Sequence, residues 1–323
     1  MEKPFYLEYL EILERRINLP EESKRRLWAQ RVGYEGHRAF DELLVEYCPK
    51  DWEILHNLNF NHPVGKTQID TLLINSQAIY HFEVKNLVQP AEYRDGEWYN
   101  QATGRRFRNY FTQMNRQREL LGHILESLDI RAPIISRLVL INDQDTVTFT
   151  EDMQEHYLKR WQIKQFLENI RQLGTMTSKR KLINPAEAAR RIVELTIEEF
   201  ERDQYPEANL IHEARKGMLC VNCKTNLVGS QSRYLVKCAR CGKVESREAA
   251  VMRTICEVGV INYEKDLTAR MVNDLIGEPS MARYIRRKLA DYFEVKGRGR
   301  GTSYNNPKAS LKKAFPHLKF RYD

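Results

Sequence analysis

The sequence has no long apolar run, and this absence excludes a membrane-spanning helix, which needs ~18 such residues. Glycine and proline are modest, at 15 and 11 of 323 residues, and no repeat is present, so collagenous, coiled-coil and wholly disordered chains are excluded. Residues 1–8 carry acids where a secretory signal carries bases and then an apolar stretch. We therefore expect a cytoplasmic protein in a reducing compartment, with two or three domains at roughly 100–200 residues each.

Basic residues are unevenly distributed along the chain. The net charge is +8, from 52 Lys and Arg against 44 Asp and Glu. Residues 210–323 carry 23 basic and 11 acidic side chains, whereas residues 1–209 carry 29 and 33. A basic C-terminal third is typical of a protein that binds a polyanion, usually nucleic acid. A basic surface that is merely solvated is the alternative that charge alone leaves open.

Hydrophobic periodicity divides the chain into helical and strand-rich stretches. It predicts helices over residues 5–17, from Pro20, and over Gly36–Tyr47, then strands near 52–60, 68–74 and 78–85. A helix is expected over 105–128, a strand buried on both faces over 134–141, and further helices over 151–172 and 185–202. The polar segment Asp203–Asn209, which contains Pro206, is interpreted as a linker.

Two carboxylates and one amine are predicted to converge on a β-hairpin. Glu83 and Lys85 are two residues apart on one strand and share a face. If the hairpin turns at Ser76-Gln77, the numbers of two paired residues on its antiparallel strands add up to about 153. This register places Asp70 beside Glu83.

This trio has the composition of a phosphodiester-hydrolysing site. Two carboxylates suit a hard cation such as Mg²⁺ or Mn²⁺, and a lysine can orient water or stabilise charge on phosphorus. A cross-strand Lys–Glu pair on a wet sheet face is the alternative, because acid-x-Lys is common.

The wider pattern resembles a known family, NERD, the nuclease-related domain family of the PD-(D/E)xK nuclease superfamily. The segments that carry the resemblance, over about residues 25–145, are Gly33-Tyr34-Glu35-Gly36, Gln68-Ile69-Asp70, Phe82-Glu83-Val84-Lys85-Asn86, Trp98 and Gln113. The resemblance implies an α/β, restriction-endonuclease-like mixed sheet flanked by helices. It implies Asp70 and Glu83 as metal ligands, Lys85 as catalytic base or charge stabiliser, and Gln113 as an auxiliary polar residue.

One position departs from the family pattern. Members of the family usually carry Gly-Glu where this chain has Gly36-His37, and that glutamate helps to hold the metal. Glu35 is close in sequence but faces roughly opposite on a helix. His37 could ligate a softer metal or contact a phosphate, and the change could also mean a weak or inactive enzyme.

Four of the six cysteines form two CxxC pairs: Cys220, Cys223, Cys238 and Cys241. Two such knuckles complete a tetrahedral Zn²⁺ shell, so the segment 210–245 resembles a zinc ribbon. Four thiolates leave no open position, which predicts structural zinc. Reactive or redox thiols are the alternative.

The C-terminal segment 246–323 resembles a winged helix-turn-helix. Thr268 and Ser280 are plausible helix N-caps, and Gly277 is a plausible helix end. The second helix directs Arg283, Arg286 and Arg287 outward, with Ile285 and Leu289 inward. A glycine-rich wing adds Lys296, Arg298 and Arg300, and a helical interaction domain is the alternative.

The sequence thus predicts three domains: a nuclease-like domain with flanking helices over 1–205, a ribbon over 210–245 and a winged helix over 246–323. A metal-dependent nuclease acting on DNA, expected to be double-stranded, is the first hypothesis. An inactive nuclease-like DNA-binding or regulatory protein is the second, and a protein-interaction scaffold is the third.

Overall fold

The structure, a computed structural model, describes residues 3–144, 146–150, 152–177, 182–197, 205–229, 234–263 and 265–306. The chain divides into two compact units. The first holds residues 29–203, and the second holds residues 3–28 together with 204–323. The first helix, α1 (Phe5–Arg16), therefore groups with the C-terminal part of the chain rather than with residues 29–203.

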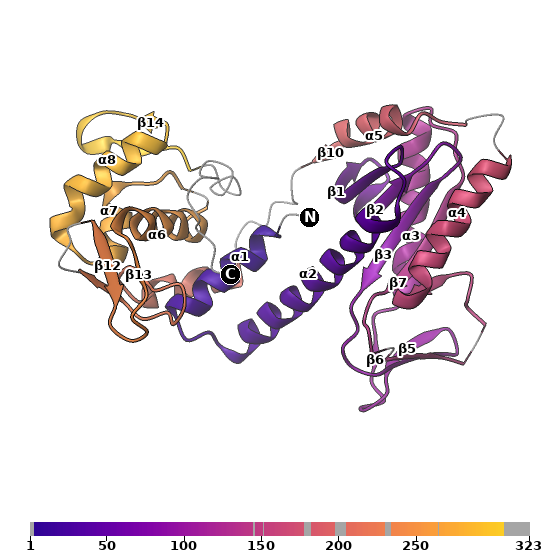
Figure 1. Cartoon of the computed structure of the whole chain (residues 1–323), viewed down its shortest axis with the longest axis horizontal. Coiled ribbons are helices and arrows are strands. Elements are labelled where there is room, and N and C mark those ends of the chain that lie inside the picture. The colour runs from indigo at the N-terminus through magenta and orange to yellow at the C-terminus, as the bar shows by residue number, and fades with distance from the viewer. Residues whose placement is uncertain are drawn as a thin grey trace. The chain divides into compact units, whose positions relative to one another are not determined.

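A six-stranded mixed sheet forms the centre of the first unit (Figure 1). Its order is β10-β1-β2-β3-β7-β9, where β1, β2 and β3 are antiparallel and β3, β7 and β9 are parallel. The strands are β1 (Glu53–His62), β2 (Gly65–Ile74), β3 (Ile79–Lys85), β7 (Ile134–Leu140), β9 (Tyr157–Lys159) and β10 (Thr196–Ile197). This mixed sheet fits the nuclease-like fold that the sequence predicts.

Helices cover both faces of the sheet. Leucine and phenylalanine side chains of α2 (Glu21–Tyr47) and α4 (Ile163–Thr177) pack with alternate residues of β2, β3 and β7. The opposite face packs against α3 (Tyr110–Ser127) and α5 (Pro185–Glu194). Apolar residues at helical spacing on the helices, and at alternate positions on the strands, produce these two cores.

A second, four-stranded sheet of the first unit packs around a cluster of aromatic residues. Its strands are β4 (Ala91–Arg94), β5 (Glu97–Asn100), β6 (Arg106–Phe107) and β8 (Val147–Phe149), in the order β6-β5-β4-β8. Trp98 is fully buried there and packs against Tyr93, Phe107 and Phe111.

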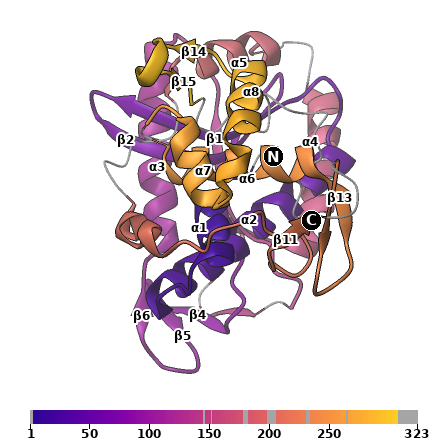
Figure 2. The same cartoon turned by 90° about the vertical axis from the view of Figure 1, so that its left-hand side faces the viewer.

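The second unit contains α1, the cysteine segment and the C-terminal helices (Figure 2). A three-stranded sheet is formed by β11 (Leu227–Gly229), β12 (Leu235–Cys238) and β13 (Val244–Ser246). It is followed by α6 (Arg247–Ile261), α7 (Ala269–Ile276), α8 (Ala282–Tyr292) and the hairpin β14 (Val295–Lys296) and β15 (Ser303–Tyr304).

Helix α1 is anchored to α6 by a buried ion pair. Arg16 Nε lies 2.7 Å from Glu257 Oε2, and the Arg16 guanidinium also donates to the carbonyl oxygen of Arg215 at 2.7 Å. The Arg16 and Glu257 side chains are 0% and 3% exposed. This anchor explains why residues 3–28 belong to the second unit.

Several predicted element boundaries are wrong. The helices expected from Pro20 and from Gly36 are one continuous helix, α2. The helix expected over 151–172 begins at Ile163 and follows strand β9, and the helix expected over 185–202 ends at Glu194. Within the expected linker, residues 203 and 204 lie outside the described chain, whereas Pro206–Glu213 is a 3₁₀ helix in which Glu207 is buried. No helix in the described ranges is long and apolar enough to cross a membrane.

Candidate functional site

The β2–β3 hairpin has the register that its turn predicts. Thr71 pairs with Phe82 and Leu72 with His81, so paired numbers sum to 153. Asp70 continues this register opposite Glu83, and its charge is close enough to raise the pKa of Glu83. The backbone N–H of Val84 donates to Asp70 Oδ2 at 2.9 Å. The two acids therefore lie side by side on one hairpin.

Glu83 is the buried centre of a polar cluster. It is 0% exposed, and Lys85 Nζ lies 2.5 Å from its Oε1. Gln113 Nε2 donates to the same oxygen at 2.5 Å, so the predicted auxiliary residue reaches the site from α3. Gln117 Nε2 donates to Glu83 Oε2 at 2.8 Å.

Sequence reasoning missed Gln117 and Tyr110. Lys85 Nζ lies 5.1 Å from the centre of the Tyr110 ring. Tyr110, Gln113 and Gln117 follow one another at spacings of three and four residues on α3, and that spacing places them on one face of the helix. This periodicity is the signal by which both residues could have been found.

Two buried carboxyl groups and one ammonium group lie together at this site. Burial raises the pKa of Asp70 and of Glu83, and the neighbouring Asp70 charge raises the pKa of Glu83 further. Burial alone would lower the pKa of Lys85, but the charges of Glu83 and Asp70 outweigh it and raise that pKa. One ammonium group therefore faces two carboxyl groups. A bound cation would add positive charge and favour the ionised form of both acids.

Two carboxylates fit a hard divalent ion that retains several waters. Among the described residues, these acids do not belong to a group of three or more side chains that could hold a metal ion. Asp70 and Glu83 would therefore hold such an ion as a pair, with water completing its shell.

His37 lies at this site, whereas Glu35 does not. His37 Nε2 is 3.9 Å from Asp70 Oδ2. Burial, with the nearby Lys85 charge, lowers the pKa of His37 to about 4, so the imidazole is neutral near pH 7. Its Nδ1 is buried without a hydrogen-bond partner among the described residues. Glu35 is exposed.

Gly36 permits the close approach of α2 that brings His37 to the site. A Cβ atom on Gly36 would lie 2.6 Å from Asn86 Cβ and 3.1 Å from Ile141 Cγ2. Asn86 directly follows Lys85, and its side-chain amide donates to the carbonyl oxygen of Val32 on α2 at 2.9 Å. The helix is thus held against the end of β3 without space for a side chain.

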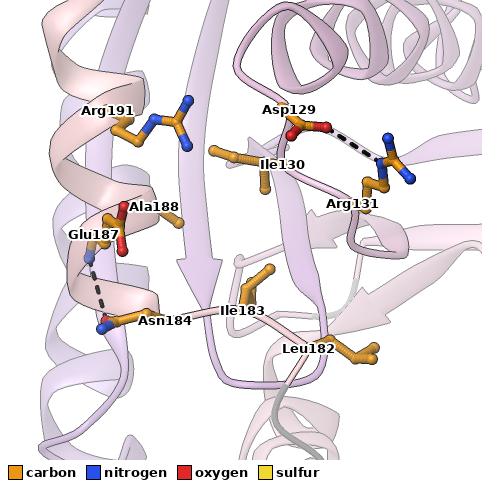
Figure 3. Close-up of a pocket in the computed structure, with 9 residues that line it drawn as sticks. All are labelled: Asp129, Ile130, Arg131, Leu182, Ile183, Asn184, Glu187, Ala188 and Arg191. Carbon is orange, nitrogen blue, oxygen red and sulfur yellow. Dashed lines mark hydrogen bonds and ion pairs between the residues drawn. The ribbon is translucent and has the colours of Figure 1, made fainter.

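A separate pocket of about 230 Å³ lies at the opposite edge of the sheet (Figure 3). It is lined by Asp129–Arg131, by residues 182–184 and by the first turns of α5. Residues 129–131 precede the amino end of β7, and Leu182 N donates to the carbonyl oxygen of Ser76 in the β2–β3 turn. Lys85 stands at the carboxyl end of β3, so this pocket is not part of the Asp70–Glu83 site.

The four paired cysteines converge in the second unit. Their sulfur atoms all lie within 4.8 Å of one another, with Cys220 and Cys241 3.6 Å apart and Cys223 and Cys238 3.3 Å apart. Four sulfur donors fit a tetrahedral metal such as zinc, with no oxygen ligand required.

The two cysteine turns have the same backbone design. Lys224 and Gly242 each follow a CxxC pair, each has positive φ (59° and 74°), and each donates to the carbonyl oxygen of the first cysteine at 3.0 Å. A turn of this shape directs both sulfur atoms of a pair to one point, which supports metal binding by the cluster.

The C-terminal helices match the predicted faces. Ile285 and Leu289 are 0% exposed. Arg283, Arg286 and Arg287 are exposed on α8, and Arg298 is exposed beyond β14. Lys296 is also exposed but pairs with Asp266 at 3.0 Å, and the side chain of Arg300 lies outside the described part of the structure.

Two of the three predicted helix signals in this segment are confirmed. The Thr268 hydroxyl caps α7 by accepting from Met271 N at 3.2 Å, and Gly277 ends that helix with φ of 72°. Ser280 does not cap α8, because it lies in a short 3₁₀ turn (Pro279–Met281) and the N-cap position is Met281.

The mixed sheet flanked by helices fits a nuclease-like fold, and two adjacent carboxyl groups and a lysine lie together on its β2–β3 hairpin. Residues 32–141, about a third of the 323-residue chain, match the family described as the nuclease-related domain, NERD. The match supports the predicted family and includes Asp70, Glu83, Lys85 and Gln113. Neither the curated proteins nor the solved structures contain a match to the chain.

Proposed function

We propose that this protein is a Mg²⁺- or Mn²⁺-dependent nuclease that hydrolyses phosphodiester bonds in DNA. The observation that carries the proposal is the convergence of Asp70, Glu83 and Lys85 on the β2–β3 hairpin, inside the segment that matches the nuclease-related domain. The bound cation would polarise a phosphoryl oxygen and acidify a water molecule.

The protein's own side chains would have defined tasks at such a site. Asp70 and Glu83 would hold the cation, and Lys85 would stabilise the charge that builds on phosphorus. Gln113 and Gln117 would orient the Glu83 carboxylate, since each donates to one of its oxygens. The neutral His37 imidazole would offer its unpartnered Nδ1 to a phosphate or to water, depending on its tautomer.

The second unit would deliver the domain to its substrate. We propose that the four cysteines hold a structural zinc ion and that α7, α8 and the β14–β15 hairpin form a winged helix that binds duplex DNA. The isolated β-bridge between Leu267 and Tyr304 supports this, because it pairs the residue before the N-cap of α7 with the β14–β15 hairpin. Exposed arginines on α8 would enter a major groove, and Arg298 would contact phosphate at the tip of the wing.

A DNA-binding protein without cleavage activity is the second candidate. The oxygens of Glu83 already accept from Lys85, Gln113 and Gln117, and His37 stands where the family pattern has glutamate. An ion would have to displace part of this network before Glu83 could bind it.

Incubation with plasmid and linear DNA, with and without Mn²⁺, tests the proposal. Asp70→Ala should abolish Mn²⁺-dependent cleavage and leave DNA retention nearly intact, whereas Glu35→Ala, a matched change of an exposed acid, should cleave normally. Arg286→Ala with Arg287→Ala should instead weaken retention. Metal-independent cleavage, or none by the unmodified chain, would reject the nuclease proposal, and retention alone would support the second candidate.

A further inference from the structure

A second pocket of the first unit contains the most exposed tryptophan among the described residues. Its volume is about 350 Å³, and its lining includes Tyr47, Asn142, Lys159, Trp161 and Lys164. Trp161 is 71% exposed, whereas tryptophan side chains in folded proteins are mostly buried. No contact within the described fold accounts for presenting so large an apolar ring to solvent.

This pocket lies at the same edge of the sheet as the Asp70–Glu83 site. Strands β3, β7 and β9 are parallel, and Lys85, Leu140 and Lys159 stand in one row across their carboxyl ends. Adjacent strands are about 4.8 Å apart, so the backbones of Lys85 and Lys159 lie roughly 10 Å apart. Ligands of open α/β sheets bind beyond the carboxyl ends of parallel strands.

A hydrogen bond between two asparagine side chains connects the pocket to the end of β3. Asn142, which lines the pocket, donates from Nδ2 to Asn86 Oδ1 at 3.0 Å, and Asn86 directly follows Lys85. The pocket is lined from α2 and α4, whereas Glu83 and Lys85 face α3. A nucleic-acid strand that contacts Lys85 would therefore cross the carboxyl ends of β3 and β7 to reach the pocket.

The side chains of the pocket suit a nucleobase. The exposed Trp161 ring offers a surface on which any base can stack. Lys164 Nζ lies 5.4 Å from the centre of the Tyr47 ring, which adds a second aromatic group with a cation at its face. Leu43 supplies an apolar lining.

The charges around the pocket favour a base over a phosphate. Arg160 is paired with Asp143 at 2.6 Å, and Lys159 Nζ donates to the carbonyl oxygen of Val147 at 3.2 Å. Glu46 and Glu168 lie near the Tyr47 side chain and raise the pKa of its hydroxyl. These acids offset much of the positive charge of the lysines, so stacking would supply most of the affinity.

We propose that the Trp161 pocket binds one unpaired base of the nucleic-acid strand whose backbone lies at Asp70 and Glu83. The inference rests on the proposed nucleic-acid substrate and extends it to a substrate with an unstacked base. Such a base is available in a single strand, a frayed end or a nucleotide turned out of a duplex.

Tryptophan fluorescence during titration with a short oligothymidylate tests the inference. The full chain carries Asp70→Ala to prevent cleavage and Arg286→Ala with Arg287→Ala to suppress binding by the second unit. In this background, Trp161→Ala should weaken binding roughly 5- to 150-fold, the range for loss of one stacked base, and should remove most of the quenching. Trp161→Phe should retain most of the affinity, because a phenyl ring still stacks.

Trp28→Ala is the matched control, since Trp28 is also exposed, at 52%, but does not line the pocket. It should bind as the background protein does. Equal affinities of Trp161→Ala and Trp28→Ala for the oligonucleotide would overturn the inference. An equal loss of affinity of Trp161→Ala for a blunt duplex and for a single strand would also overturn it.

The two proposals fail in different ways. A protein that binds the oligonucleotide through Trp161 but never cleaves DNA would retain this inference and lose the nuclease proposal. A protein that cleaves DNA and binds without help from Trp161 would do the reverse.

Discussion

Replacing Gly36 by alanine should show how much the close packing of α2 against Asn86 matters, once the gain in helix propensity has been subtracted with a control substitution. The added Cβ would lie 2.6 Å from Asn86 Cβ, whereas ordinary van der Waals contact begins near 3.4 Å. Asn86 or the helix must therefore move by about 1 Å. Gly33 is in the same helix, and a Cβ atom there would meet nothing within 4 Å, so Gly33→Ala is the matched control.

Both substitutions change the helix propensity of α2, but only Gly36→Ala also changes its packing. Each gains about 1 kcal/mol of helix propensity, because alanine restricts the unfolded chain more than glycine does. Only Gly36→Ala adds overpacking, which typically costs about 1–3 kcal/mol. The two variants should therefore differ by about 1–3 kcal/mol in the free energy of unfolding, with Gly33→Ala the more stable. At about 2–4 °C per kcal/mol for a unit of this size, the Tm values should separate measurably.

Gly36→Ala should reduce the rate of cleavage as well as the stability of the first unit. A displacement of about 1 Å near a reacting group can reduce a rate roughly 100-fold, and Asn86 lies next to Lys85. Thermal unfolding and Mn²⁺-dependent plasmid cleavage of both variants would be compared with those of the unmodified chain. Equal stabilisation and equal cleavage by the two variants would refute the proposed close contact between α2 and the end of β3.

Two further predictions concern the second unit. Arg16→Met should destabilise that unit by about 3–5 kcal/mol in urea unfolding, because it leaves Glu257 buried and unpaired, whereas Arg16→Met with Glu257→Leu should recover much of the loss. Removing the proposed zinc ion with a chelator should expose the four paired cysteines to a thiol reagent and unfold the segment that contains them. Cys48 should react slowly both before and after chelation, since burial raises the pKa of its thiol to about 12.

Each of these predictions can fail clearly. A double variant no more stable than Arg16→Met would show that the ion pair does not limit the stability of this unit. Four cysteines that react equally fast with and without chelator would exclude a metal that closes the cluster.

Local patterns predicted the parts of the site that depend on neighbouring residues. The β2–β3 register followed from a turn signal and side-chain alternation, which placed Asp70 beside Glu83. The faces of α8 followed from the 3.6-residue period, and the cysteine cluster followed from the two CxxC turns. In each case, the geometry within one turn or hairpin decides which side chains meet.

Long-range packing decided what the sequence pattern missed. Strand β9 has three residues, too few to show a period, and its existence depends on pairing with β7. The sequence pattern predicted separate helices from Pro20 and from Gly36, but α2 is continuous, and Asn86 and Ile141 pack directly against Gly36. The grouping of α1 with the second unit depends on Glu257, 241 residues away from Arg16.

The sequence by itself determined the chemistry: two carboxylates and a lysine on one hairpin, four thiols in two turns, and arginines along one helical face. Only the tertiary structure decided that Gln117 and His37 join Glu83 and Asp70, and that Trp161 is exposed near them at the same edge of the sheet. These residues come from separate elements, and packing across the sheet, rather than any local preference, brings them together.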